Sequence, residues 1–178
     1  MRIISGQFKS RRFNYKLPDG IRPTTDIAKE TLFNILDNLI EYEDKRILDL
    51  YAGSGNIGIE FLSRGASFVH FNDKNYNSVN YIKKILAELK IENYKLSKAN
   101  STQILKEFGK DFDIIYVDPP YFSDEYDKVE KILIDNIEDF KNKIVIVESD
   151  INRTSKWNFE IIKEKTISSS NFKIYEIS

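Results

Sequence analysis

Residues 46–65, RILDLYAGSGNIGIEFLSRG, form the stretch that decides the fold of this chain. A short apolar run leads into a glycine-rich loop, and an amphipathic helical pattern follows. Gly53, Gly55 and Gly58 have the G-x-G-x-x-G spacing. In this pattern Gly53 permits a sharp turn after the strand, Gly55 lets a ligand approach bare backbone, and Gly58 lets the helix pack close to the strand. The sequence therefore predicts a strand–loop–helix unit that binds a nucleotide-like cofactor.

Two acidic residues narrow the choice of cofactor. Asp73 lies 20 positions after Gly53 at the end of the next apolar run, where a carboxylate can hold ribose hydroxyls. Asp49 lies inside the first predicted strand, where a buried charge is costly unless it meets a partner. The cationic amino group of adenosylmethionine would supply that partner, whereas a pyrophosphate would be repelled. The predicted cofactor-binding residues around the loop are Asp49, Tyr51, Ala52, Gly53, Ser54, Gly55 and Asp73.

A second chemical motif, Asp118-Pro119-Pro120-Tyr121, follows another apolar run. In open α/β sheets, ligands bind beyond the carboxyl ends of the strands, so this motif and the glycine loop should face one cleft. The prolines remove two N–H donors and leave the Asp118 carboxylate and backbone carbonyls as acceptors. Such acceptors suit a planar –NH2 group, and Tyr121 can stack on the ring that carries it. We predict that Asp118, Pro119, Pro120 and Tyr121 are the catalytic residues.

The remaining pattern indicates an α/β fold, because strands and helices alternate after residue 46. A doubly wound, mostly parallel sheet should end in an antiparallel hairpin with a turn at 168–171. A basic N-terminal β-hairpin extension is predicted over 1–22 and the catalytic domain over 23–178. Helices are predicted at 24–40, 56–64, 75–90, 102–108 and 124–140, and strands at 47–52, 67–72, 94–99, 113–117, 143–147, 159–165 and 172–177.

Composition excludes several classes of site. The chain of 178 residues contains no cysteine and one histidine. Disulfides and thiolate metal sites are therefore excluded, and neither a histidine metal centre nor a histidine triad is expected. No apolar run is long enough to span a membrane, and residues 1–6 do not resemble a signal peptide. These features predict a cytoplasmic, metal-free protein, which we expect to be monomeric.

Charge is concentrated at the N-terminus. Residues 1–22 carry six basic side chains and one acidic one, whereas the rest of the chain has a net charge of −6. A basic segment on an acidic body favours an anionic partner, and Phe8, Phe13 and Tyr15 interleave with the charges as in nucleic-acid-binding surfaces. The predicted RNA-binding residues are Arg2, Lys9, Arg11, Arg12 and Arg22.

Nearly the whole chain resembles one family, the bacterial 16S ribosomal RNA guanine-N2 methyltransferases. The resemblance includes Arg2-Ile-Ile-Ser-Gly6, Arg22-Pro23-Thr24, Phe33-Asn-Ile-Leu36, the loop with Glu60 and Ser63-Arg-Gly-Ala66, and Asp118-Pro-Pro-Tyr121. It implies a Rossmann-like class I methyltransferase fold that uses S-adenosyl-L-methionine. It also implies that the basic hairpin grips ribosomal RNA or the small ribosomal subunit, while the Asp-Pro-Pro-Tyr loop holds the target guanine.

The chain departs from the family at two places. An acid usually follows the third strand, but Asn100 stands there, and its amide oxygen is expected to accept a hydrogen bond from the cofactor adenine. The closing hairpin usually carries a glycine, whereas this chain has Ser168-Ser-Ser-Asn171. Because Asn tolerates turn geometry, we expect the hairpin to form.

Three other functions remain open from the sequence. An adenine-N6 methyltransferase acting on DNA or RNA would use the same –NH2 chemistry, although no separate DNA-recognition domain is visible. A nicotinamide-dependent dehydrogenase would need a hydride-handling residue, and His70 is poorly placed for it. The third is an inactive RNA-binding module. We expect His70 and Trp157 to be structural.

The other polar residues invite simpler interpretations. Glu148 follows the fifth predicted strand, and capping is favoured over ligand binding there. An exposed helix face explains Glu60 as well as a functional role does. The three lysines of the 75–90 helix fit a solvated face better than an RNA track: Lys83, Lys84 and Lys90.

Overall fold

The computed structural model describes residues 1–21, 24–121, 123–153 and 157–178. Its helices and strands, in chain order, are α1 (Asp26–Leu36), β1 (Arg46–Asp49), α2 (Asn56–Ser63), β2 (Phe68–Asn72), α3 (Tyr76–Glu88), β3 (Tyr94–Ser97), α4 (Ser101–Phe108), the 3-10 helix η1 (Gly109–Asp111), β4 (Ile114–Val117), α5 (Glu125–Asp135), α6 (Ile137–Phe140), β5 (Ile144–Asp150), β6 (Glu160–Ile167) and β7 (Ser170–Glu176).

The strands form one seven-stranded sheet with the order β3-β2-β1-β4-β5-β7-β6. Within this order, each pair of neighbouring strands from β3 to β5 is parallel, and β7 pairs antiparallel with both β5 and β6. The predicted parallel sheet with a terminal antiparallel hairpin is confirmed. The strand order reverses beside β1, so the carboxyl ends of β1 and β4 border the crevice in which such sheets bind ligands.

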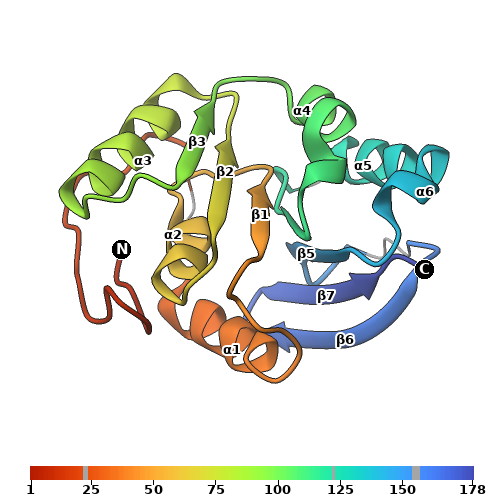
Figure 1. Ribbon diagram of the computed structural model, residues 1–178, viewed down its shortest axis with the longest axis horizontal. Coiled ribbons are helices and arrows are strands. Elements are labelled where there is room, and N and C mark those ends of the chain that lie inside the picture. The colour runs from red at the N-terminus through yellow and green to blue at the C-terminus, as the bar shows by residue number, and fades with distance from the viewer. Residues whose placement is uncertain (22–23, 122, 154–156) are drawn as a thin grey trace.

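Helices cover both faces of the sheet. Successive residues of a strand point to opposite faces, so Ile47 packs with α1, α2 and α3, whereas Leu48 packs with α4, α5 and α6. Figure 1 shows these two groups of helices on either side of the sheet, with β3 and β6 at its opposite edges. The strands β4 and β5 are buried on both faces, which explains their continuous apolar sequences.

The N-terminal segment forms a smaller hairpin than predicted. It folds back on itself, with the Ile3 N–H donating to the Arg11 carbonyl and the Ser10 N–H donating to the Ile3 carbonyl, but a single antiparallel bridge joins Arg2 to Arg12 and no strands form there. Its backbone bonds to the far end of α2 instead of extending a ladder: the Gln7 N–H donates to the Ser63 carbonyl at 2.7 Å. The segment lies beside α2 in Figure 1.

Three predicted boundaries also need correction. The first helix ends at Leu36 rather than near residue 40. The helix predicted over 124–140 breaks at Asn136, whose side chain bonds the Ile132 carbonyl at 2.8 Å and so competes with the helical backbone. The closing hairpin forms, but its left-handed residue is Ser168 (φ 55°), while Asn171 belongs to β7.

Candidate functional site

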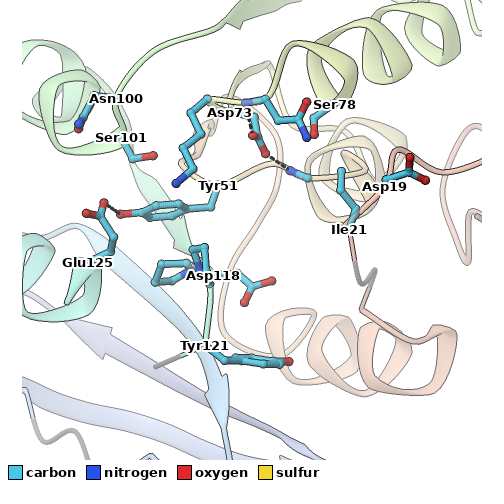
Figure 2. Close-up of a pocket in the computed structure, with 16 residues that line it drawn as sticks. Asp19, Ile21, Tyr51, Asp73, Ser78, Asn100, Ser101, Asp118, Tyr121 and Glu125 are labelled. Carbon is cyan, nitrogen blue, oxygen red and sulfur yellow. Dashed lines mark hydrogen bonds between the residues drawn. The ribbon is translucent and has the colours of Figure 1, made fainter. Parts of the chain in front are cut away.

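Two adjoining pockets lie at the carboxyl ends of the parallel strands. The larger has a volume of about 550 Å³, and the smaller, of about 30 Å³, shares Ile21, Tyr51, Gly53 and Asp118 with it. Figure 2 shows Asp73 and Asp118 on separate walls of the larger pocket, with Tyr51 between them. The glycine loop and the Asp-Pro-Pro-Tyr turn therefore face one cleft. All predicted cofactor and catalytic residues except Gly55 line one pocket or the other.

Asp73 is held rigidly beside the loop. Its Oδ2 accepts the Gly53 N–H and its Oδ1 accepts the Asn75 N–H, both at 2.8 Å. A carboxylate has about four lone-pair sites, so two remain for ligand hydroxyls. Its position and remaining acceptor capacity suit ribose recognition.

Asp49 is buried beneath the loop. Its Oδ2 accepts the Gly58 N–H at 3.1 Å, and within the described part of the chain it forms no ion pair. Burial raises the pKa of Asp49 to about 7, against the lowering effect of the Gly58 hydrogen bond. A cationic group in the smaller pocket would stabilise the charged form.

The three glycines differ in what constrains them. A Cβ on Gly58 would lie 2.2 Å from the buried Phe71 ring, which confirms that this glycine allows close packing of helix on strand. Gly55 (φ 72°) faces Ile82, where a Cβ would lie 2.8 Å away, and it is not among the residues that line the two pockets. Its role of exposing backbone to a ligand stays a prediction. Gly53 (φ 53°) is the glycine whose backbone lines both pockets.

The turn after β4 is held in place by a tyrosine of α5. The Tyr126 hydroxyl lies 3.3 Å from the Pro119 carbonyl and 3.0 Å from the Glu148 carbonyl. Burial, followed by the charges of Glu148 and Asp49, raises the pKa of Asp118 well above its ordinary value. A carboxyl group with a raised pKa is a stronger base, and Asp118 borders both pockets.

Glu148 is a buried structural acceptor. Its carboxylate accepts hydrogen bonds from Thr24 Oγ1 at 2.9 Å, from Ser170 Oγ at 2.8 Å and from the Tyr116 hydroxyl. It thus joins β4, β5 and β7 to the chain entering α1, and it lies within β5 rather than after the strand.

Asn100 lines the larger pocket, but its oxygen is already engaged. As the N-cap of α4, its Oδ1 accepts the Thr102 N–H at 2.9 Å and the Thr102 hydroxyl at 2.6 Å. A carbonyl oxygen has two lone pairs, and these two hydrogen bonds use both of them.

The basic residues of the N-terminal segment lie away from the pockets. Three of them form ion pairs, Arg2 with Asp26 at 3.2 Å, Arg11 with Glu88 at 3.5 Å and Lys16 with Asp19 at 3.8 Å, whereas Lys9 and Arg12 are exposed. The segment contacts the end of α2 opposite the glycine loop, and an eight-residue helix is about 12 Å long. The predicted Arg22 lies outside the described residues.

A buried glutamate holds this segment in place. Glu60 accepts the N–H groups of Ile4 and Ser5, each at 2.9 Å, and contacts Lys29 at 3.2 Å and Arg64 at 3.0 Å. Its side chain is fully buried, so the exposed-face interpretation of Glu60 is wrong. The Lys29 amine also donates to Asn56 Oδ1 at 2.7 Å, directly after the glycine loop.

Comparisons with known proteins agree with this geometry. Residues 1–176 match the family described as Conserved hypothetical protein 95. "Ribosomal RNA small subunit methyltransferase D" of Escherichia coli K12 is 32% identical over 99% of this chain and 89% of its own length. The protein of that name from Buchnera aphidicola subsp. Baizongia pistaciae is 32% identical over 98% of this chain and 91% of its own. The chain belongs to this methyltransferase family.

Solved structures support the same assignment. A candidate methyltransferase from Escherichia coli has a TM-score of 0.80 and 31% identity, and the match covers 100% of this chain and 98% of that one. A candidate methylase from Haemophilus influenzae has a TM-score of 0.74 and 29% identity, over 99% and 97% of the two chains. The fold is therefore that of a Rossmann-like class I methyltransferase.

The pockets fit S-adenosyl-L-methionine, the cofactor of methyltransferases with this fold. Asp73 offers acceptors for the ribose, and the unpaired buried carboxylate of Asp49 suits the amino group of the methionyl end. Gly53 brings bare backbone between these two carboxylates. No cluster of three or more potential metal ligands occurs among the described residues, and none of the described helices could cross a bilayer.

Several pocket residues were missed from the sequence. Asp19, Gly20 and Ile21 reach the pocket from the N-terminal segment, and Glu125 reaches it from the start of α5. Only the acidic character of residue 125, shortly after the Asp-Pro-Pro-Tyr motif, could have drawn attention to it. His70 is structural, as expected: it contacts Ser97 Oγ at 2.8 Å, and burial lowers its pKa to about 4.

Proposed function

We propose that this protein methylates the exocyclic N2 amine of a guanine in small-subunit ribosomal RNA. The observation that carries the proposal is that Asp118 and Gly53 line the same two adjoining pockets. A donor bound at the glycine loop and an amine bound at Asp118 would then be neighbours. The names of the Escherichia coli and Buchnera relatives support ribosomal RNA of the small subunit as the substrate.

In this mechanism the Asp-Pro-Pro-Tyr turn positions the base. The Asp118 carboxylate and the Pro119 carbonyl accept the two amine hydrogens, which directs the nitrogen lone pair out of the ring plane. Tyr121 stacks on the base after it leaves its helix. S-adenosyl-L-methionine supplies the electrophilic methyl group. As the nitrogen–carbon bond forms and the sulfur–carbon bond breaks, the nitrogen loses one proton, for which Asp118 is the nearby base.

Other parts of the chain bind the RNA in this proposal. Lys9 and Arg12 contact phosphates at the N-terminal hairpin, Arg2 and Arg11 add positive charge around them, and Arg22, outside the described residues, also binds RNA. Because none of the described basic side chains of the hairpin lines either pocket, the RNA would reach from the hairpin to the pocket. We further propose that the protein acts as a monomer in the cytoplasm.

The deciding experiment uses cells that lack this protein. Their total RNA and isolated small ribosomal subunits are incubated with the purified protein and labelled S-adenosyl-L-methionine, then digested to nucleosides. We expect labelled N2-methylguanosine in the small-subunit RNA. Labelled N6-methyladenosine would instead support the adenine methyltransferase, and absence of label in every RNA would support an RNA-binding module.

The role of Asp118 is tested in the same assay. The Asp118→Ala variant should lose about 10²- to 10³-fold in kcat, because one positioned acceptor of the transition state is removed. The Asp135→Ala variant, which alters an exposed carboxylate of α5, serves as the control and should keep wild-type activity. Unchanged kcat in Asp118→Ala would refute the proposed mechanism.

A further inference from the structure

The wall of the larger pocket beside β3 lacks the expected acceptor. Asn100 stands where an acid usually follows the third strand, and both lone pairs of its oxygen are used by Thr102. An adenine ring bound there would present its 6-amine, which carries two N–H donors. Another acceptor on the same wall is therefore needed.

Glu125 provides such an acceptor. It is the first residue of α5, and its side chain is 23% exposed and lines the larger pocket. Its Oε2 accepts the Tyr51 hydroxyl at 3.0 Å, and its Oε1 contacts Lys128 Nζ at 3.1 Å. A carboxylate has about four lone-pair sites, so two remain unused by these contacts.

The surroundings of Glu125 place it at the end of the pocket next to Asn100. The Tyr51 hydroxyl bonds Glu125, and the same pocket is lined by Ser101, which directly follows Asn100. Figure 2 shows Glu125, Tyr51, Ser101 and Asn100 gathered on one side, whereas Tyr121 lies apart from them. Glu125 thus lies on the wall formed by the loop after β1, by α4 and by α5.

We propose that Glu125 accepts a hydrogen bond from the adenine 6-amine of S-adenosyl-L-methionine, and that Tyr51 orients the carboxylate for this role. The inference rests on the cofactor of the proposed function and is independent of the target base. Glu125 takes over the acceptor role that Asn100 cannot fill. An acid on α5 thereby compensates for the missing acid after β3.

The test measures binding by isothermal titration calorimetry, without RNA. Two ligands are compared: S-adenosylhomocysteine, and its analogue in which hydrogen replaces the adenine 6-amine. Wild-type protein should bind the natural ligand about 10- to 100-fold more tightly, because the analogue leaves a desolvated carboxylate without its donor. In Glu125→Ala the two dissociation constants should lie within about twofold of each other.

Three further variants sharpen the test. Asn100→Ser keeps a helix-capping oxygen and should retain the wild-type ratio of the two dissociation constants. Tyr51→Phe should reduce that ratio, because the carboxylate loses its orienting hydroxyl. Glu138→Ala removes an exposed glutamate of α6 and should change nothing. Circular dichroism melting of each variant checks that the fold is kept.

The outcomes separate the inference from the proposed function. Equal binding of both ligands by the wild type, or a lost preference in Asn100→Ser but not in Glu125→Ala, overturns the role of Glu125 and leaves RNA methylation standing. A wild-type ratio in Glu125→Ala together with a raised KM for RNA would assign this carboxylate to the target base, which also overturns the inference. If wild-type protein binds neither ligand, both proposals fail.

Discussion

Replacing Glu60 by Gln should strongly destabilise the protein, although residue 60 lies outside the pockets. The carboxylate of Glu60 accepts two backbone N–H groups of the N-terminal segment and contacts Lys29 and Arg64. Lys29 is fully buried, and Glu60 is its ion-pair partner among the described residues. The glutamine amide keeps the shape but removes the charge and presents N–H donors to other donors.

The magnitude follows from the charge that remains. Breaking a buried ion pair by removing one partner costs about 3 to 5 kcal/mol, because the other charge stays buried without compensation. For a chain of this size, that loss lowers Tm by about 8 to 13 °C. In the double variant Glu60→Gln with Lys29→Met, the uncompensated buried charge of Lys29 is removed as well. The double variant should therefore be more stable than Glu60→Gln alone.

Urea denaturation and thermal melting at pH 7.5 measure these differences, with the exposed Glu41→Gln as the control. The two single variants and the double variant form a cycle that isolates the interaction between residues 29 and 60. A loss below about 1 kcal/mol in Glu60→Gln would refute the reasoning, since a charge that matters so little cannot anchor the segment. Additive effects in the cycle would refute the pairing of Glu60 with Lys29.

Three further predictions concern the pocket and its supports. Burial raises the pKa of Asp49 from 3.8 to about 7, so the free protein should lose stability as pH rises through this interval. Over the same change Asp49 becomes charged and can pair with the amino group of the ligand. The calorimetric affinity for S-adenosylhomocysteine should therefore rise about fivefold to tenfold from pH 6 to 7.5. This rise should vanish in Asp49→Asn. Gly58→Ala should cost about 1 to 3 kcal/mol in urea denaturation, because the new Cβ would press on the buried Phe71 ring; an unchanged midpoint would contradict the close packing. Tyr126→Phe removes the hydroxyl beside the Pro119 carbonyl and should lower kcat for RNA methylation severalfold with unchanged cofactor affinity, whereas a loss of cofactor affinity alone would argue against a role at the base site.

The sequence predicted those features that depend on local pattern. The glycine spacing and the acid 20 positions later identified Gly53 and Asp73, which are joined in the structure by a hydrogen bond. The continuous apolar runs identified β4 and β5 as central strands. Trp157 was expected to pack, and it stacks on Tyr175 with the ring centroids 5.4 Å apart.

Features that depend on distant contacts could not be predicted in this way. The sequence pattern is compatible with Glu60 on the exposed face of a helix. Only the folded chain brings to its carboxylate the N–H groups of Ile4 and Ser5, which lie over 50 positions away in the sequence. The capping role of Asn100, whose oxygen accepts the Thr102 N–H, was not among the sequence predictions. Glu125 reaches the pocket through the position of α5, which its acidic character and its place after the Asp-Pro-Pro-Tyr motif do not determine.

The position of β7 has a consequence for how the protein is made. This strand is inserted between β5 and β6, although it follows both in the chain, and it brings the Ser170 hydroxyl to Glu148. During synthesis one edge of β5 therefore stays unpaired until residues 170–176 have left the ribosome. A nascent chain that stops before these residues exposes the unpaired backbone N–H and C=O groups of β5, and such an edge favours aggregation.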